Sequence, residues 1–165
     1  MNMHSTRQAS WFSLAIMVLA ADQAAKSYID ATTSLGWSHA VTPFFNLVHV
    51  LNPGAAFSFL AGAGGWQRWF FLAIAVAISF WLIWMIRAPR PRAESLAFSL
   101  ILGGALGNAF DRAVRGQVID YLDLHLGGWH WPAFNVADIG ITVGAASLVL
   151  TSFAGARQPQ ATENI

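Results

Sequence analysis

Four apolar stretches, each long enough to cross a lipid bilayer, constrain this 165-residue chain more than any other feature. They cover residues 11–29, 66–86, 94–114 and 134–154. A hydrocarbon core about 30 Å thick is spanned by roughly 20 helical residues. Hydrophobic residues make up 56% of the chain and charged residues 10%, against about 45–50% and about 25% in soluble proteins. The sequence predicts an all-α membrane protein, a four-transmembrane-helix bundle forming a single integral membrane domain over residues 1–165.

Charge and cysteine content exclude several classes of function. The net charge is +1, and the nine basic residues form no stripe along any predicted helix, so we expect no nucleic-acid partner. Cysteine is absent, which excludes disulfides, thiolate metal sites and a cysteine nucleophile. No Gly-x-Ser-x-Gly motif marks a serine nucleophile either.

The distribution of Lys and Arg predicts the orientation in the membrane, because cytoplasmic loops are enriched in these residues. Basic residues precede the first stretch, separate the second from the third and follow the fourth: Arg7, Arg87, Arg90, Arg92 and Arg157. Residues 31–67 contain none. We therefore expect cytoplasmic termini and outer connections over residues 30–65 and 115–132. Arg112 and Arg115 are exceptions to this distribution, because they lie on the predicted outer side, and their position requires a specific explanation.

The first stretch allows a second interpretation. Arg7, an apolar run and Ala20-Ala21 resemble the layout of a cleavable signal peptide. However, Asp22 and Lys26 are four residues apart, so they share one helix face and can form an ion pair while the apolar run continues. We expect the segment to be retained as a helix.

The outer connections contain signals for short strands. Residues 44–60 resemble two apolar strands around Asn52-Pro53-Gly54, a strong turn signal. Residues 118–122 form another candidate strand, followed by Gly127-Gly128. The sequence thus predicts a small extracytoplasmic β-hairpin or sheet at the membrane surface, suited to an extended apolar peptide.

The third stretch ends in a polar face. Asn108, Asp111, Arg112 and Arg115 are spaced at i, i+3, i+4 and i+7, after Gly103, Gly104 and Gly107, which permit close approach of another helix. An Asp111–Arg112 pair that only anchors the helix end would explain part of this pattern. A functional site would explain it equally well, since ionisable groups in membrane segments usually carry function.

Two further aspartates lie at the predicted outer face. Asn135 and Asp138 at the start of the fourth stretch could be a helix cap and a first-turn carboxylate. Asp120, in the candidate strand, is expected at the same depth as Asp138. Two carboxylates about 4 Å apart repel by roughly 4 kcal/mol at an effective dielectric near 20, so one would hold a proton and the other would be ionised. Such a pair can activate water as general acid and general base.

A metal site is a weaker hypothesis for this region. Asp123, His125 and His130 are close in sequence, but there is no His-Glu-x-x-His motif. Histidines beside Trp129 and Trp131 are typical of an interfacial surface. We expect no metal, and the roles of Asp111, Asp123, His125 and His130 stay open.

Several motifs occur in an order that resembles the bacterial lipoprotein signal peptidase family, also called signal peptidase II. They are Asp22-Gln23 with Lys26, Asn52-x-Gly54-Ala55-Ala56-Phe57, Gly104-Ala105-x-Gly107-Asn108-x-x-Asp111-Arg112 with Val118-Ile119-Asp120-Tyr121, and Phe134-Asn135-Val136-Ala137-Asp138. The resemblance spans roughly residues 22–149 and has no departure at a motif position.

This resemblance implies an aspartic endopeptidase of the bacterial cytoplasmic (inner) membrane, with its active site at the outer face. It would remove signal peptides from prolipoproteins, cutting before the diacylglyceryl-modified cysteine, with membrane lipids as further partners and no cofactor. By motif position, Asp120 and Asp138 would be catalytic. Residues matching substrate-binding or supporting positions are Asn52, Gly104, Asn108, Arg112, Asn135, Asp22 and Lys26.

Two other classes remain open from the sequence. A small membrane transporter or proton-relay protein would also carry intramembrane carboxylates, but its polar groups should occur at mid-membrane depth on several helices. A noncatalytic assembly subunit would explain the glycine-rich helices, but not two aspartates accompanied by two asparagines.

Overall fold

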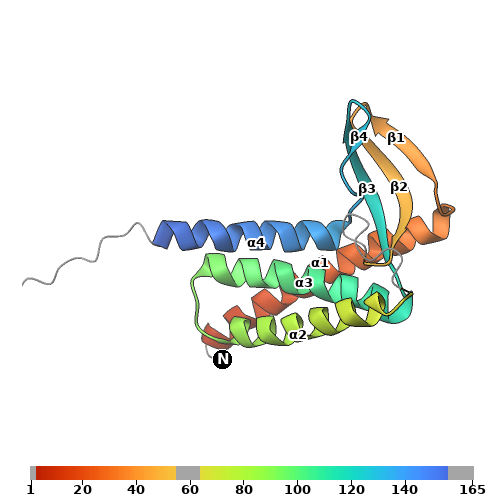
Figure 1. Ribbon diagram of the computed structural model, residues 1–165. Helices are drawn as coiled ribbons and strands as arrows, with labels where there is room; N and C mark the ends of the chain where they lie inside the picture. The colour runs from red at the N-terminus through yellow and green to blue at the C-terminus, as the bar shows by residue number, and fades with distance from the viewer. Residues whose placement is uncertain (1–2, 55–63, 156–165) are drawn as a thin grey trace, which may run out of the picture.

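The computed structural model describes residues 3–54 and 64–155, which form four helices and a small sheet (Figure 1). The elements in chain order are α1 (Met3–Thr32), β1 (Ser38–Thr42), β2 (Phe45–Asn52), α2 (Gln67–Arg87), α3 (Arg92–Val114), β3 (Val118–Leu126), β4 (Trp129–His130) and α4 (Val136–Gly155).

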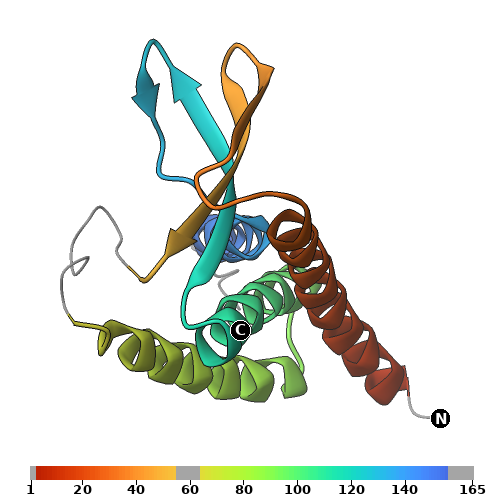
Figure 2. The same ribbon diagram turned by 90° about the vertical axis from the view of Figure 1, so that its right-hand side faces the viewer.

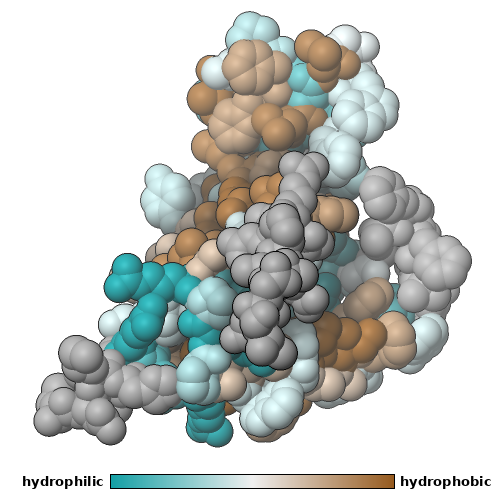
Figure 3. Space-filling model, turned by 90° about the vertical axis from the view of Figure 1, so that its left-hand side faces the viewer, coloured by the Kyte–Doolittle hydropathy of each residue, from teal (hydrophilic) through white to brown (hydrophobic). Residues whose placement is uncertain are grey.

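Helix α3 is the centre of the helical layer and packs against α1, α2 and α4. The sheet stands at one end of this layer, whereas the start of α1, the α2–α3 connection and the end of α4 lie at the opposite end (Figure 1). Figure 3 looks onto that opposite end, where hydrophilic residues gather low in the view beside apolar side chains. Hydrophilic side chains are thus present at the end of the helical layer opposite the sheet.

Within the described residues, α2, α3 and α4 are long and apolar enough to cross a membrane. Helix α1 is the longest of the four, but it begins with a polar segment and contains Asp22 and Lys26. The structure therefore supports a membrane protein with four helices, three candidate spans and a small antiparallel sheet.

Helix boundaries differ most from the sequence predictions in α1, which begins at Met3 and ends at Thr32 rather than covering residues 11–29. Residues 3–10 contain neither proline nor glycine, so nothing local stops the helix before the apolar run. Helix α4 begins at Val136 rather than at residue 134, because Asn135 caps it.

Close approach of the helices depends on glycines of α3. A Cβ atom on Gly103 would meet the carbonyl oxygen of Ala15 in α1 at 2.5 Å, and one on Gly104 would overlap the carbonyl oxygen of Ala137 in α4. On another face of α3, the apolar side chains of Phe98 and Leu102 pack with α2. Glycines therefore bring the backbones of α1, α3 and α4 together beneath the sheet.

The four strands are antiparallel in the order β1-β2-β3-β4. The strand predicted over residues 118–122 is confirmed as the start of β3. The first strand of the hairpin predicted around Asn52-Pro53-Gly54 is confirmed as β2, which ends at Asn52 and pairs with β1 and β3. The second strand of that hairpin, predicted over residues 55–60, lies outside the described residues. Gly54 does mark a turn, because its φ is 100°, a backbone conformation that residues other than glycine rarely adopt.

Candidate active site

Asp120 lies on β3 at the junction between the sheet and the helices, with only 2% of its surface exposed. Its two carboxylate oxygens accept hydrogen bonds from Nδ2 of Asn52 at 3.0 Å and from Nδ2 of Asn135 at 2.6 Å. Burial, followed by the negative charge of Asp138, raises the pKa of Asp120 to about 7, although both amide hydrogen bonds act in the opposite direction. Asp120 can therefore hold a proton near neutral pH.

Asp138 lies in the first turn of α4, where it takes part in a capping box. Its backbone N–H donates to Oδ1 of Asn135 at 3.0 Å, and its Oδ2 accepts from the backbone N–H of Asn135 at 3.3 Å. Its Oδ1 accepts from Nδ2 of Asn108 at 2.8 Å. The predicted capping role of Asn135 is confirmed, and the same contacts fix the carboxylate of Asp138.

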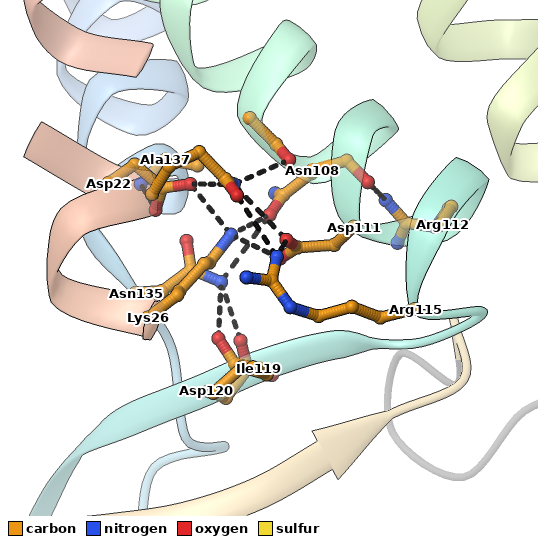
Figure 4. Close-up of polar contacts among 12 residues, drawn as sticks. Asp22, Lys26, Asn108, Asp111, Arg112, Arg115, Ile119, Asp120, Asn135 and Ala137 are labelled. Atoms are coloured by element: carbon orange, nitrogen blue, oxygen red, sulfur yellow. Dashed lines mark hydrogen bonds and ion pairs between the residues drawn. The ribbon is translucent and has the colours of Figure 1, made fainter. Parts of the chain in front are cut away.

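Asn135 connects the two aspartates. It is fully buried, and it uses Nδ2 for Asp120 and Oδ1 for the backbone of Asp138. Figure 4 shows Asp120 reaching from β3 toward Asn135, with Asn108 beyond it on α3. The end of β2, the strand β3 and the start of α4 therefore place Asn52, Asp120 and Asp138 around one amide network.

A buried ion cluster lies next to this network (Figure 4). Nζ of Lys26 lies 2.8 Å from Asp22 and 2.8 Å from Asp111, and all three side chains are fully buried. Arg115 adds a second cation on Asp111. The predicted Asp22–Lys26 pair is confirmed. The Asp111–Arg112 anchor is wrong, because Asp111 points toward α1 and takes its cations from Lys26 and Arg115.

The ion cluster contacts the aspartate network at two points. Nζ of Lys26 donates to Oδ1 of Asn108 at 2.9 Å, which leaves Nδ2 of Asn108 to donate to Asp138. Oδ1 of Asp22 accepts from the backbone N–H of Ala137 at 2.9 Å. Asp22 and Lys26 therefore orient Asn108 and the first turn of α4.

Gln23 is a residue of this region whose contacts the sequence did not reveal. Its Nε2 donates to Asp22, Asp111 and the carbonyl of Gly107, and its Oε1 accepts from Arg115. The one available signal was its place beside Asp22 in a motif, which says nothing about its partners.

Arg112 and Gly104 occupy different parts of the site. Nη1 of Arg112 donates to the carbonyl of Asn108 at 3.1 Å, and its guanidinium lies 5.4 Å from the ring centroid of Phe71. Its buried Nε has no hydrogen-bond partner in the described part of the chain. Gly104 lies one turn before Asn108, where it allows α3 to touch α4 at Ala137.

A cavity of about 640 Å³ opens beside the aspartates. Its polar lining includes Asn52 and Asp138, and the rest is mainly apolar: Leu124, Trp131, Pro132, Ala133, Phe134, Ile139, Thr142 and Val143. A mostly apolar pocket with a few convergent polar groups is typical of a ligand site. This cavity can accommodate an apolar chain next to Asp138.

The polar group at the far end of the sheet is separate from the aspartate network. Asp123 accepts from Nδ2 of Asn46 at 2.8 Å and contacts Nδ1 of His130 at 2.9 Å, and His125 stacks on His130. Partial burial acts to raise the pKa of Asp123, but the hydrogen bonds from His130 and Asn46 outweigh it and lower that pKa. These contacts link strands β2, β3 and β4.

Comparisons with known proteins agree with the motif resemblance. A family model described as signal peptidase (SPase) II matches residues 14–154. A protein named lipoprotein signal peptidase from Paraburkholderia phymatum is 51% identical over 142 residues, which cover 86% of each chain. A protein of the same name from Burkholderia mallei is 50% identical, and the match covers 86% of each chain. Another, from Ralstonia nicotianae, is 51% identical, and the match covers 85% of this chain and 82% of that protein.

Two solved structures, both described as bacterial membrane enzymes, share this fold. One has a TM-score of 0.83 and 29% sequence identity, and the match covers 95% of both chains. The other has a TM-score of 0.77 and 31% identity, covering 87% of this chain and 92% of its own.

Proposed function

Because this chain belongs to the signal peptidase II family, we propose that it removes the signal peptide from prolipoproteins by aspartic endopeptidase chemistry. The observation that carries the proposal is the joining of Asp120 and Asp138 through Asn135 beside an apolar cavity. Catalysis by this pair needs no cofactor.

We assign the resting proton to Asp120, since burial and the neighbouring charge raise its pKa to about 7. Asp138 is then the general base: it takes a proton from water as the water oxygen attacks the scissile carbonyl carbon. Asp120 donates its proton to the carbonyl oxygen, which gives a tetrahedral diol. As the diol collapses, Asp120 recovers that proton, and Asp138 gives its own proton to the departing amine.

Substrate binding follows from the remaining contacts. The cavity beside Asp138 would hold apolar substrate segments or acyl chains, which suits a precursor already carrying a diacylglyceryl group on its cysteine. The buried Nε of Arg112, which has no partner in the part of the chain that the structure describes, would donate to a substrate carbonyl. Asn52, Asn108 and Asn135 orient the aspartates, while Gly104, Asp22 and Lys26 support the helices that carry them.

We further propose four membrane spans in the bacterial inner membrane, with both termini in the cytoplasm and the aspartates at the outer face. The start of α1, the α2–α3 connection and the end of α4 share one end of the fold (Figure 1), which is consistent with this topology. Reporter fusions after Arg90 should read cytoplasmic, and fusions after Ser38 and Gly127 should read outside. A cytoplasmic readout after Gly127 would overturn the topology.

The transporter alternative is not favoured. The buried ionisable side chains of the described residues lie in the sheet or at the end of the helices next to it, rather than forming a path along the bundle (Figure 4). A proton relay would require such a path.

Cleavage of a lipidated prolipoprotein by the purified protein tests the proposed reaction. Asp120→Asn and Asp138→Asn should each abolish cleavage while precursor binding is retained, because asparagine keeps the size but cannot cycle a proton. The double variant should be barely worse than either single variant, since the two groups act as a unit. Asp123→Asn is the matched control on the same strand and should retain most activity.

The same assay tests the substrate. The unlipidated precursor should be cleaved far more slowly than the lipidated form, and equal rates would refute lipid-dependent recognition. Near-normal turnover by all three aspartate variants would refute the aspartic mechanism.

A further inference from the structure

Arg68, in the first turn of α2, is a cation without a carboxylate partner in the described part of the chain. Its Nη2 donates to the carbonyl of Ala113 at 2.8 Å, and its guanidinium stacks over the Trp69 ring at 4.6 Å. Its Nε is buried and has no hydrogen-bond partner among the described residues. By contrast, Arg115 at the same end of the fold is neutralised by Asp111. Arg68 therefore retains both a free charge and a free donor.

A cavity of about 400 Å³ lies beside Arg68, lined by Pro53, Gly65, Gln67, Arg68, Trp69, Gly116 and Gln117. Gln67 is only 4% exposed, yet its Oε1 accepts no hydrogen bond from residues 3–54 or 64–155. Leaving a buried polar atom unpaired costs about 1–3 kcal/mol. Trp66, which precedes α2, provides no side-chain cap, and the first N–H groups of a helix have no acceptor within the helix itself. The cavity thus combines an unneutralised cation with an unpaired hydrogen-bond acceptor.

The position of this cavity fits the headgroup region of a membrane. Trp66 and Trp69 are 52% and 62% exposed, and exposed tryptophans at the end of an apolar helix are typical of the membrane–water interface. The start of α2 lies at the sheet end of the fold (Figures 1 and 2). The larger cavity at Asp138 involves β3 and α4, so the two cavities lie on different helices.

We propose that the cavity at Arg68 binds the phosphoglycerol headgroup of an anionic phospholipid. The phosphate would accept hydrogen bonds from the Arg68 guanidinium and the first turn of α2, which favours anions. A glycerol hydroxyl would donate to Oε1 of Gln67. A headgroup ending in an ammonium could also donate there, but it would place a second cation beside Arg68. The site is independent of the proposed peptidase chemistry, and it requires only that α2 crosses the membrane.

Binding of a soluble short-chain phosphatidylglycerol to the purified full chain tests this site, measured by calorimetry or by tryptophan fluorescence. We expect saturable binding of phosphatidylglycerol, and at least tenfold weaker binding of phosphatidylcholine and phosphatidylethanolamine of equal chain length. Inorganic phosphate should also bind at least tenfold more weakly, since it lacks both the hydroxyl and the acyl chains. Equal affinities for all four probes would overturn the proposal, and phosphate binding as tightly as the lipid would show a plain anion site.

Variants distinguish the two halves of the headgroup. Arg68→Gln should weaken phosphatidylglycerol binding at least tenfold, whereas Arg68→Lys, which keeps the charge, should lose less. Gln67→Leu should weaken lipid binding and leave inorganic phosphate binding unchanged. Arg92→Gln, at the opposite end of the fold, is the matched control and should bind normally. Prolipoprotein cleavage in detergent should be unchanged in Arg68→Gln, and unaltered lipid binding by this variant would refute the site.

Discussion

The contact between Gly104 and α4 predicts a large effect from adding a single methyl group. In Gly104→Ala, the new Cβ would overlap the backbone carbonyl oxygen of Ala137. Non-bonded C···O contacts normally lie at about 3.3–3.6 Å, so the start of α4 must move away by roughly 1 Å. The 2.8 Å hydrogen bond from Asn108 to Asp138 spans the same interface one turn further along. The displacement would therefore break this bond.

Two magnitudes follow from that displacement. Overpacking typically costs about 1–3 kcal/mol of stability, and a 1 Å misplacement of a catalytic group can cost about 10²-fold in rate. We expect Gly104→Ala to remain folded in detergent with a lower Tm and to lose about 10²-fold in kcat for cleavage of a lipidated precursor. The loss should fall on kcat more than on KM, because the broken hydrogen bond positions the proposed catalytic carboxylate of Asp138, whereas the cavity keeps its apolar side chains.

Gly140→Ala is the matched control within the same helix pair. Its new Cβ would meet the Leu100 carbonyl oxygen at 3.1 Å and a methyl group of Val18 at 3.2 Å, which small adjustments can absorb. This variant should keep kcat within a few-fold of wild type. Normal turnover by Gly104→Ala, or an equal loss of activity in both variants, would refute a role of the α3–α4 contact at Gly104 in placing Asp138.

Three further predictions concern the charges around the site. Because the pKa of Asp120 is raised to about 7 from 3.8, the folded protein keeps a proton between these pH values that the unfolded chain has released. The free energy of unfolding should therefore fall as pH rises from about 4 to 7. Asp120→Asn should flatten this dependence of Tm on pH in thermal melts. Activity that needs this proton should decline above about pH 7 in a kcat/KM profile. Asn52→Ala removes a hydrogen bond that favours the ionised carboxylate, so the alkaline limb should move to higher pH. Lys26→Met leaves Asp22 and Asp111 buried without this cation. The free energy of unfolding, measured by denaturation in detergent, should fall by about 3–5 kcal/mol. An unchanged denaturation midpoint would contradict a stabilising role of the ion cluster.

Much of the helical fold could be predicted because apolar runs of membrane length have few alternatives in lipid. The pairing of Asp22 with Lys26 was also predictable, since i, i+4 spacing places two side chains on one helix face. The sheet was harder to predict. Nothing local in residues 44–60 shows that β2 pairs with β3, because that pairing joins segments about 70 residues apart.

For the candidate site too, some features could be predicted from the sequence and others could not. Its chemical components, Asp120, Asp138 and the asparagines, could be identified from residue type and motif. Their connections could not, because Asn135 has four hydrogen-bonding groups and the sequence does not say which partner each one takes. The role of Asp111 stayed open for a similar reason. Arg112 is its neighbour in sequence and an Asp111–Arg112 pair was one alternative, but the helix directs Asp111 toward Lys26 instead.

The capping box at the start of α4 gives Asp138 two simultaneous roles. Its ionised carboxylate accepts the backbone N–H of Asn135 and interacts favourably with the positive end of the helix. On the proposed mechanism, Asp138 becomes neutral each time it takes a proton from water, and both interactions weaken until that proton leaves with the amine. The first turn of α4 would therefore loosen and tighten once per catalytic cycle. Phe134 and Ile139 line the apolar cavity on either side of this turn. Such a movement would therefore weaken the contacts between the cavity and the cleaved peptide at the step when the peptide dissociates.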